Sequence, residues 1–278
     1  TLHLARHGVD KIDVPVLDAD WDSEAYRTVA GQNANNSVRV SDDFLQAVAN
    51  DDTWDLIRRT DGAVAKSVRA RDLWHQIGQA SWSSADPGIQ YHDTINDWHT
   101  CPESGDIRGS NPCSEYMFLD DTACNLASLN LTAFYDMNAK TPTFDLEGYR
   151  HACRLWTMVL EISVLMAQYP SKEIAQLSYE FRTLGLGYAN LGGLLMGMGH
   201  PYDSDAGRAI GGSLAAIMTG VSYGTSAELA KEHGAFDSFD KSRDSMLRVV
   251  RNHRRAAYGE SSGYDQLSIL PVPLAENE

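Results

Sequence analysis

The sequence predicts an α/β fold, because short segments typical of strands alternate with longer segments typical of helices. Strand-like segments occur near residues 38–40, 88–91 and 124, and helical periodicity is clearest over 144–169 and 203–232. The 278 residues, 43% hydrophobic and 22% charged, are enough for one large domain or two small ones. We therefore expect a globular α/β protein with a substantial core.

The first fifty residues predict a helix, a loop, a strand and a second helix, in that order. Residues 1–30 are typical of a short helix with a polar connector. Residues 31–37, rich in asparagine, predict a loop because asparagine and glycine tolerate left-handed conformations. A strand begins at residue 38, and Ser41, followed by two aspartates, caps the next helix.

Residues 51–101 predict a turn at 61–62, a helix over 70–83 and a short strand over 88–91. His99 and Cys101 could suggest a metal site, but no second pair of ligands accompanies them in the sequence. We therefore expect a structural role for both residues and no bound metal.

The C-terminal half predicts long helices around a glycine-rich segment. The helix over 144–169 carries an apolar stripe that should face the core, and a further helix restarts after Pro170. The stripe consists of Tyr149, Ala152, Cys153, Trp156, Val159, Leu160, Ser163 and Val164. Residues 181–193 contain Gly-x-Gly but lack the third glycine and the acidic residue of a dinucleotide site, so they predict a tight strand-to-helix turn. Helices over 203–232, capped by Asp203 or Ser204, and over 241–257 complete the chain.

Charge and composition exclude several classes of function. The formal net charge of −15 argues against a nucleic-acid-binding surface, and any site for an anionic nucleotide must be local. No apolar run approaches the roughly 18 residues of a membrane span, and no signal peptide is recognisable. Four cysteines without a Cys-x-x-Cys pair predict a cytoplasmic protein. Because the chain does not begin with methionine, we expect it to be part of a longer protein.

The chemistry of the chain is concentrated in residues 110–116, Ser-Asn-Pro-Cys-Ser-Glu-Tyr. Pro112 disfavours a helix, which predicts an extended segment with Asn111, Cys113 and Glu115 on one face. A thiol, a carboxylate and an amide would then surround one point. By itself the pattern favours a buried structural cysteine, because free cysteines are among the most buried residues.

Three segments in order resemble the ribonucleotide reductase family. Residues 111–115 match its finger-loop motif Asn-x-Cys-x-Glu, and 124–131 resemble its Cys-Asn-Leu-(Gly/Ala)-Ser-(Ile/Leu)-Asn-Leu segment. Residues 85–101 resemble the run before the finger loop in the adenosylcobalamin-dependent (class II) branch. The resemblance implies part of a ten-stranded α/β barrel with a central finger loop at about 108–118. Residues 1–278 would then be one incomplete catalytic domain, with the N- and C-terminal parts of the enzyme absent.

The resemblance also implies roles for individual residues. Cys113 would carry a thiyl radical, Glu115 would take the proton of the ribose 3′-hydroxyl, and Asn111 would bind the ribose hydroxyls. Cys124 would be one of two reducing cysteines, whose partner is expected upstream of residue 1. Three residues of the finger loop would bind substrate: Ser110, Pro112 and Ser114. A separate loop near the start of the chain would lie between the effector and the substrate base, and it contains Asn33, Asn35, Asn36 and Ser37.

The implied enzyme is of the ribonucleoside-diphosphate reductase type. It would use a ribonucleotide substrate, adenosylcobalamin, dNTP or ATP effectors and a thioredoxin-type reductant, and it could form a homodimer. The family's Pro-Thr-Gly-Thr loop and C-terminal cysteine pair are absent, so we expect the isolated chain to be inactive. Three alternatives stay open: the large subunit of the iron-dependent class I enzyme, a non-catalytic barrel fragment with a regulatory or interaction role, and, more weakly, a hydrolase with Cys113 as nucleophile.

Overall fold

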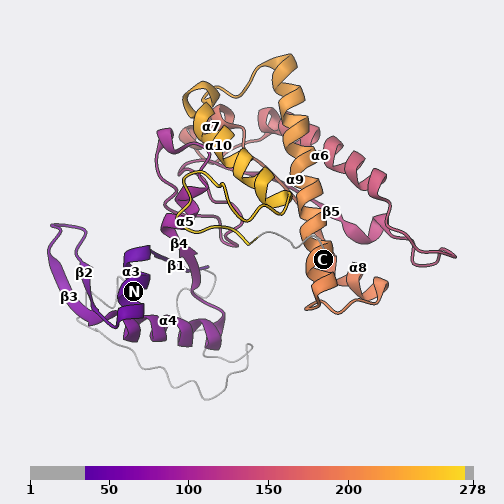
Figure 1. Cartoon of the computed structure of the whole chain (residues 1–278). Coiled ribbons are helices and arrows are strands. Elements are labelled where there is room, and N and C mark those ends of the chain that lie inside the picture. Colours follow the sequence, from indigo (N-terminus) through magenta and orange to yellow (C-terminus); the bar gives the residue numbers. More distant parts are fainter. Residues whose placement is uncertain (1–34, 273–278) are drawn as a thin grey trace, which may run out of the picture. The chain divides into compact units, whose positions relative to one another are not determined.

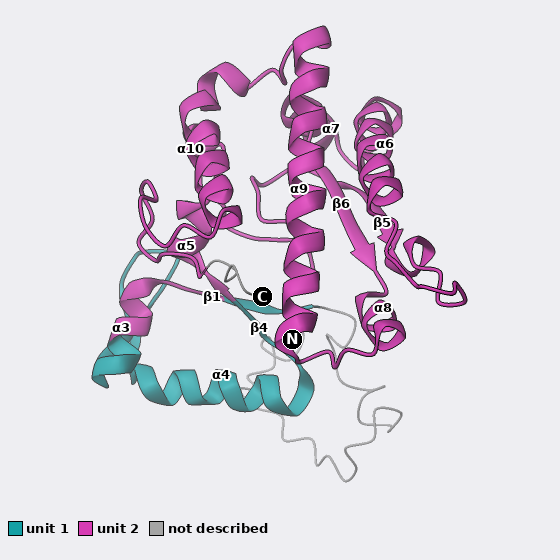
Figure 2. Cartoon of the chain, turned by 45° about the vertical axis from the view of Figure 1, so that its right-hand side comes forward, with its two compact units in different colours: residues 1–38, 47–89 teal, residues 39–46, 90–278 magenta. Residues whose placement is uncertain are grey.

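The computed structural model describes residues 35–272, which form α-helices α3–α10 and strands β1–β6 (Figure 1). The chain divides into two compact units: residues 1–38 with 47–89, and residues 39–46 with 90–278 (Figure 2). The predicted helix and connector over 1–30 lie outside the described residues. Among the helices of the described part, none is long and apolar enough to cross a membrane.

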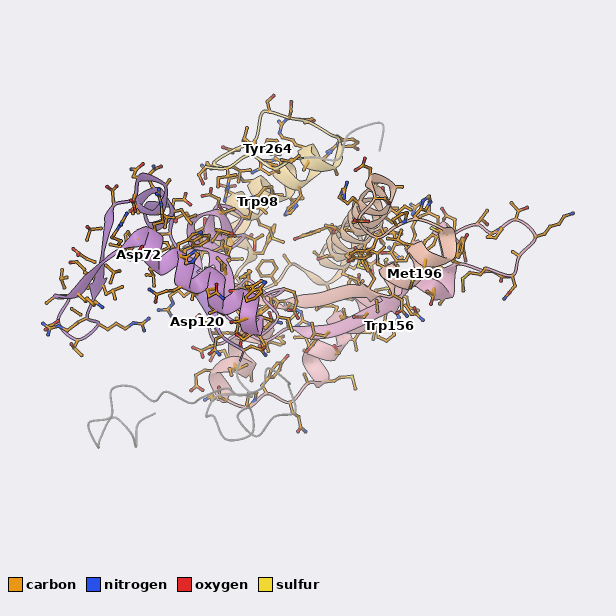
Figure 3. The ribbon with its side chains drawn as sticks, turned by 90° about the horizontal axis from the view of Figure 1, so that it is seen from below. Asp72, Trp98, Asp120, Trp156, Met196 and Tyr264 are labelled. Carbon is orange, nitrogen blue, oxygen red and sulfur yellow. The ribbon has the colours of Figure 1, made fainter. Side chains whose placement is uncertain are left out.

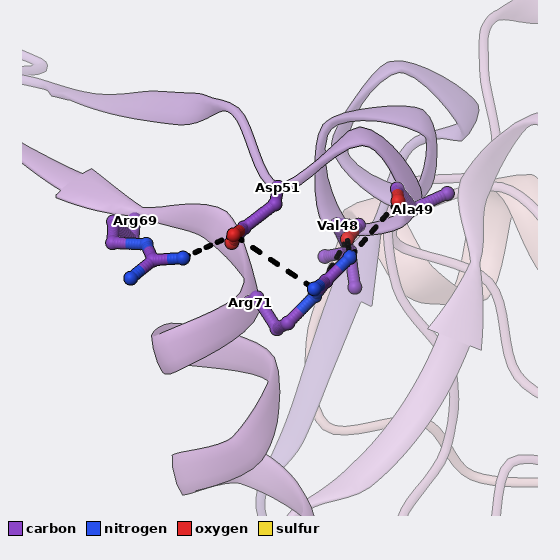
Figure 4. A network of polar contacts seen from close by, with 5 residues as sticks. All are labelled: Val48, Ala49, Asp51, Arg69 and Arg71. Carbon is purple, nitrogen blue, oxygen red and sulfur yellow. Dashed lines mark hydrogen bonds and ion pairs between the residues drawn. The ribbon is translucent and has the colours of Figure 1, made fainter.

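The first unit contains a β-hairpin and a helix. Strands β2 (Thr53–Ile57) and β3 (Val64–Arg69) pair antiparallel, and helix α4 (Ala70–Ser84) follows directly. Ion pairs anchor the base of the hairpin, where the Asp51 carboxylate contacts Arg69 and Arg71 (Figure 4). Arg71 also donates to the carbonyl oxygens of Val48 and Ala49 in the last turn of helix α3. The hairpin is thereby joined to the preceding helix.

The predicted strands and helix near the unit boundary are confirmed. Strand β1 (Ser37–Val40) precedes helix α3 (Asp42–Asn50), and β4 (Gly88–Tyr91) follows α4. β1 and β4 are hydrogen-bonded neighbours in one sheet. The Ser41 hydroxyl accepts a hydrogen bond from the Phe44 amide (3.3 Å), as expected for an N-cap.

The core of the second unit lies between a parallel strand pair and two long helices. β5 (Asn125–Asn130) pairs in parallel with β6 (Leu184–Ala189), so residues 59 positions apart in the sequence become neighbours. Helix α6 (Leu146–Met166) packs on both strands and on helix α9 (Asp205–His233). The buried core consists of Leu129, Leu131, Tyr149, Cys153, Leu194, Leu214 and Met218. Strand β5, which begins directly after Cys124, and its partner β6 are therefore held by a continuous apolar core.

The predicted inward stripe of helix α6 is partly wrong. Tyr149, Cys153 and Leu160 are buried, but Trp156 and Val159 are 41% and 40% exposed (Trp156 is labelled in Figure 3). The buried residues recur at four- and three-residue spacing along one narrow seam, and the two exceptions lie beside it. Periodicity identified the helix correctly but overestimated the width of its buried face.

The predicted helices that follow Pro170 are confirmed, whereas the short helix His92–Asp97 was not predicted from the sequence. Helices α5 (His92–Asp97), α7 (Lys172–Phe181), α8 (Leu191–Met198) and α10 (Phe239–Ala257) complete it, with short 3₁₀ turns at Pro102–Ser104 and Leu131–Phe134. Ser171 caps α7, and Ser204, rather than Asp203, caps α9. The Gly-x-Gly segment is strand β6, which turns into α8 through Asn190 in the left-handed conformation. It is thus the strand-to-helix turn that the sequence predicts.

Candidate active site

The segment around Cys113 is a tight turn, so the predicted extended conformation is wrong. The Ser114 amide donates to the Asn111 carbonyl (3.1 Å), and Ser114 has a φ of 65°. Pro112 occupies the second position of this turn, where its fixed φ is favourable. The property of Pro112 that excludes a helix favours a turn equally well. The alternation of faces expected for a strand does not apply to Asn111, Cys113 and Glu115.

The Asn111 side chain stabilises the turn. Its Oδ1 atom accepts a hydrogen bond from the Tyr116 amide (3.0 Å), which closes the loop on the far side of Cys113. Asparagine side chains commonly bond nearby backbone in this way. The Nδ2 group is the part of the amide that can donate to a ribose oxygen. Asn111 thus has a structural role besides the role implied by the family resemblance.

A buried glutamine contacts both ends of the turn. Gln90, on strand β4 and only 5% exposed, donates from Nε2 to the hydroxyls of Ser110 (2.6 Å) and Ser114 (3.2 Å). Its Oε1 atom accepts from the Arg39 guanidinium (2.7 Å). Sequence reasoning missed Gln90 and Arg39 as site residues. The available signal was a lone amide between Ile89 and Tyr91 on a short apolar strand.

The two reactive groups of the motif face solvent. Cys113 is a free, exposed thiol, and Glu115 is exposed as well. A structural cysteine would be buried, as Cys101 and Cys153 are, at 2% and 0% exposure. The exposure of Cys113 on a hydrogen-bonded turn favours a chemical role over the structural alternative.

Cys124 lies just before strand β5 and is partly buried. Burial, together with a smaller effect of the negative charge of Glu115, raises the pKa of its thiol to about 11. The second effect means that Glu115 and Cys124 are close enough to interact electrostatically. The thiol sits against Gly185 of strand β6, where a Cβ atom would lie 2.5 Å from the sulfur. The parallel strand pair therefore holds Cys124 near the carboxylate of the turn.

A hydroxyl network links the turn to the strand pair. The Tyr116 hydroxyl donates to Thr122 Oγ1 (2.8 Å) and also lies 2.9 Å from Thr183 Oγ1. Thr183 in turn donates to the carbonyl of Ala123, the residue before Cys124 (2.8 Å). Burial raises the pKa of Tyr116, which keeps its hydroxyl protonated as a donor. The two cysteine-bearing segments are thus joined by side chains as well as by the chain.

The loop expected between effector and substrate base is described only in part. Asn33 lies outside the described residues, and Asn35, Asn36 and Ser37 are exposed in the first unit. The Asn36 carbonyl accepts from the Gly88 amide (2.9 Å), and its Nδ2 atom lies 3.5 Å from an Asp86 carboxylate oxygen. These contacts tie the loop to strand β4 within that unit.

His99 has a structural role. Its ring is buried, Nε2 lies 2.9 Å from the Gly105 carbonyl, and Nδ1 accepts from the Cys101 amide (3.3 Å). Both nitrogens are therefore occupied by backbone, and burial lowers the pKa of the ring. In the part of the chain that the structure describes, no three His, Cys, Asp or Glu side chains form a group that could hold a metal ion.

An α/β fold that presents an exposed thiol, a nearby carboxylate and a second thiol defines a site for thiol-based chemistry. Residues 16–258 match the family described as ribonucleotide reductase, barrel domain. Because this match covers most of the chain, the chain belongs to that family.

Several relatives carry the same family name. The chain is 64% identical over 273 residues to the vitamin B12-dependent ribonucleotide reductases of Bradyrhizobium diazoefficiens and Agrobacterium fabrum. Each match covers 98% of this chain and 22% or 21% of the relative, respectively. The vitamin B12-dependent ribonucleoside-diphosphate reductase of Thermoplasma acidophilum is 31% identical over 74% of this chain and 27% of the relative. The chain thus spans about a fifth to a quarter of the length of these curated relatives.

Proposed function

We propose that the protein containing this chain reduces ribonucleotides to 2′-deoxyribonucleotides with adenosylcobalamin, and that this chain supplies the finger loop of its catalytic barrel. The observation that carries the proposal is the exposed Cys113 thiol on a turn built by Asn111, inside the region matched by the family. The names of the 64% identical relatives support the B12-dependent branch. They do not favour the iron-dependent class I alternative.

The described residues fit the cofactor at one point, the exposed thiol. When bound, adenosylcobalamin supplies an organic radical that can remove a hydrogen atom from a thiol, and such a thiol must be accessible. Cys113 meets this requirement, whereas the buried Cys101 and Cys153 do not. Cys113 would therefore face the cofactor.

The reaction needs a radical because hydroxide is a poor leaving group. A thiyl radical on Cys113 takes the hydrogen atom from ribose C3′, which is reversible because the S–H and C–H bonds are of comparable strength. Glu115 accepts the 3′-hydroxyl proton as general base, and the 2′-hydroxyl leaves as water after gaining a proton. Asn111 would hold the ribose hydroxyls through its Nδ2 group, with Ser110, Pro112 and Ser114 beside the substrate.

Two thiols supply the two electrons of the reduction and become a disulfide. The raised pKa of Cys124 keeps this thiol protonated at neutral pH, so it can deliver a proton to the departing hydroxyl. Its partner must be another cysteine: Cys113 carries the radical, and Cys101 and Cys153 are buried in the core. We place the partner in the rest of the complete protein. For this reason we expect the isolated chain to be inactive.

The wider assembly follows from the same proposal. Asn33, Asn35, Asn36 and Ser37 would lie between a dNTP or ATP effector and the substrate base. A thioredoxin-type protein would restore the thiols, the enzyme could act as a homodimer, and it would work in the cytoplasm. The substrate would be a ribonucleoside diphosphate, as in the name of the Thermoplasma acidophilum relative.

The test uses the complete protein under anaerobic conditions with adenosylcobalamin, a dithiol and each ribonucleotide in turn. We expect deoxyribonucleotide to form, to require the cobalamin, and to disappear in Cys113→Ser. Cys153→Ala is the matched control: it removes a buried core thiol and should retain product formation at reduced stability. Product that needs an iron-containing partner subunit instead would assign the protein to class I. A folded protein without product in either assay would support the non-catalytic alternative.

A further inference from the structure

The amide of Gln90 has only one orientation that satisfies its neighbours. The Arg39 guanidinium can only donate, so the Gln90 oxygen must face it (2.7 Å). The NH₂ group is then directed at the hydroxyls of Ser110 and Ser114. Arg39 is itself held by the Ile107 carbonyl (3.2 Å). The partly buried Arg39 side chain thus determines which atoms Gln90 presents to the turn.

The two serines are the residues that bracket the turn. Ser110 precedes Asn111, and its hydroxyl lies 2.8 Å from the Asn111 carbonyl, the same carbonyl that accepts from the Ser114 amide. Ser114 ends the turn with a φ of 65°, a conformation that an L-residue adopts only when its surroundings compensate the strain. Gln90, which is buried, bonds to both hydroxyls, whereas Cys113 between the two serines is exposed.

We propose that Gln90, oriented by Arg39, is a positioning residue that holds the Ser110–Ser114 turn in the one conformation that presents the Cys113 thiol for reaction. The inference rests on the proposed function for its catalytic consequence. Its structural part, the restraint of the turn, stands on the hydrogen bonds alone. A displacement of about 1 Å at a reacting atom can cost about a hundredfold in rate, so a loosened turn should affect chemistry more than binding.

Two variants of Gln90 separate the contact with the serines from the contact with Arg39. Gln90→Met keeps the approximate size and removes both sets of hydrogen bonds. Gln90→Glu keeps an acceptor for Arg39, as a charge-assisted pair, but an ionised carboxylate cannot donate, so the serine hydroxyls would have to donate to it instead. For Ser110 this would mean giving up its bond to the Asn111 carbonyl. Asn252→Leu is the matched control, because Asn252 is an equally buried amide (1% exposed) that bonds only to the Asp265 backbone, away from the turn.

The first measurement is kinetic and uses the complete protein with cofactor and substrate. We expect Gln90→Met and Gln90→Glu to lower kcat by about a hundredfold with KM unchanged, and Asn252→Leu to change neither. Equal kcat values for Gln90→Met and the unmodified protein would overturn the proposal.

The second measurement is hydrogen exchange of residues 110–118 in the complete protein without cofactor. The Ser114 and Tyr116 amides are both hydrogen-bonded to Asn111 and should exchange about tenfold faster in both Gln90 variants, but not in Asn252→Leu. Unchanged exchange would overturn the inference whether or not the protein is a reductase. Faster exchange in a protein that makes no deoxyribonucleotide would support the restraint of the turn and refute the proposed function.

Discussion

Cys113 and Cys124 are eleven residues apart in the sequence, yet the molecule holds them in different ways. Cys113 is exposed on a turn whose shape depends on side-chain hydrogen bonds from Gln90 and Asn111. Cys124 is partly buried at the start of a parallel strand, against a glycine of the neighbouring strand. The comparison shows that the exposed thiol is positioned by polar contacts and the buried one by packing. Each should therefore respond to a different kind of substitution.

Alkylation at pH 8 tests the difference between the two thiols most strongly. The pKa of about 11 lowers the thiolate fraction of Cys124 about a hundredfold relative to an ordinary thiol, and the thiolate is the reactive form. We expect Cys113 to react first and the Cys124 rate to rise about tenfold per pH unit until about pH 11. Reaction with iodoacetamide followed by peptide mass spectrometry measures both rates.

The same assay can show whether the two regions are coupled. Glu115→Gln removes a negative charge that raises the pKa of Cys124, so this variant should speed Cys124 alkylation at pH 8. Glu147→Gln, an exposed acid on helix α6, is the control and should have no effect. Equal rates for the two cysteines in the unmodified chain would remove the distinction between them.

Gly185→Ala tests the packing of the Cys124 region. The new methyl group would lie 2.5 Å from both the Cys124 sulfur and Leu126 Cδ2, and 3.1 Å from the Asn125 carbonyl. We expect a loss of about 1–3 kcal/mol in the free energy of unfolding, measured by urea denaturation. Gly187→Ala, two residues along the same strand, meets only Ser128 Oγ at 3.9 Å and should be tolerated. If both variants unfold at the same urea concentration, packing at Gly185 does not position Cys124.

Substitutions of Ser114 test the backbone conformation of the turn, and we expect them to have the smallest effect on stability. Ser114→Ala removes the hydroxyl and keeps a side chain at a φ of 65°, whereas Ser114→Gly removes the hydroxyl and relieves the strain. We expect the glycine variant to be more stable than the alanine variant by about 1 kcal/mol in urea denaturation. The reverse order would mean that the left-handed conformation of Ser114 is not retained in solution.

Much of the fold follows from local patterns in the sequence. Ser171 and Ser204 precede helices that they cap, and the short strand at residues 88–91 is where its composition predicts it. The candidate residues Asn111, Cys113, Glu115 and Cys124 follow from short motifs whose order resembles that of the ribonucleotide reductase family. Such features depend on a few neighbouring residues, so a linear sequence contains them.

The tertiary structure decided what depends on distant partners. Pro112 was compatible with either a strand or a turn, and contacts with Gln90, twenty or more residues away, accompany the turn. Trp156 lies on a predicted inward stripe, but the position of the neighbouring helix and strands leaves it exposed. The sequence by itself thus determined the helices, their caps and the reactive groups, because these depend on local propensity and side-chain chemistry. The conformation of the Cys113 turn and the burial of Cys124 depend on residues brought together only by folding, and no local pattern specifies which residues those are.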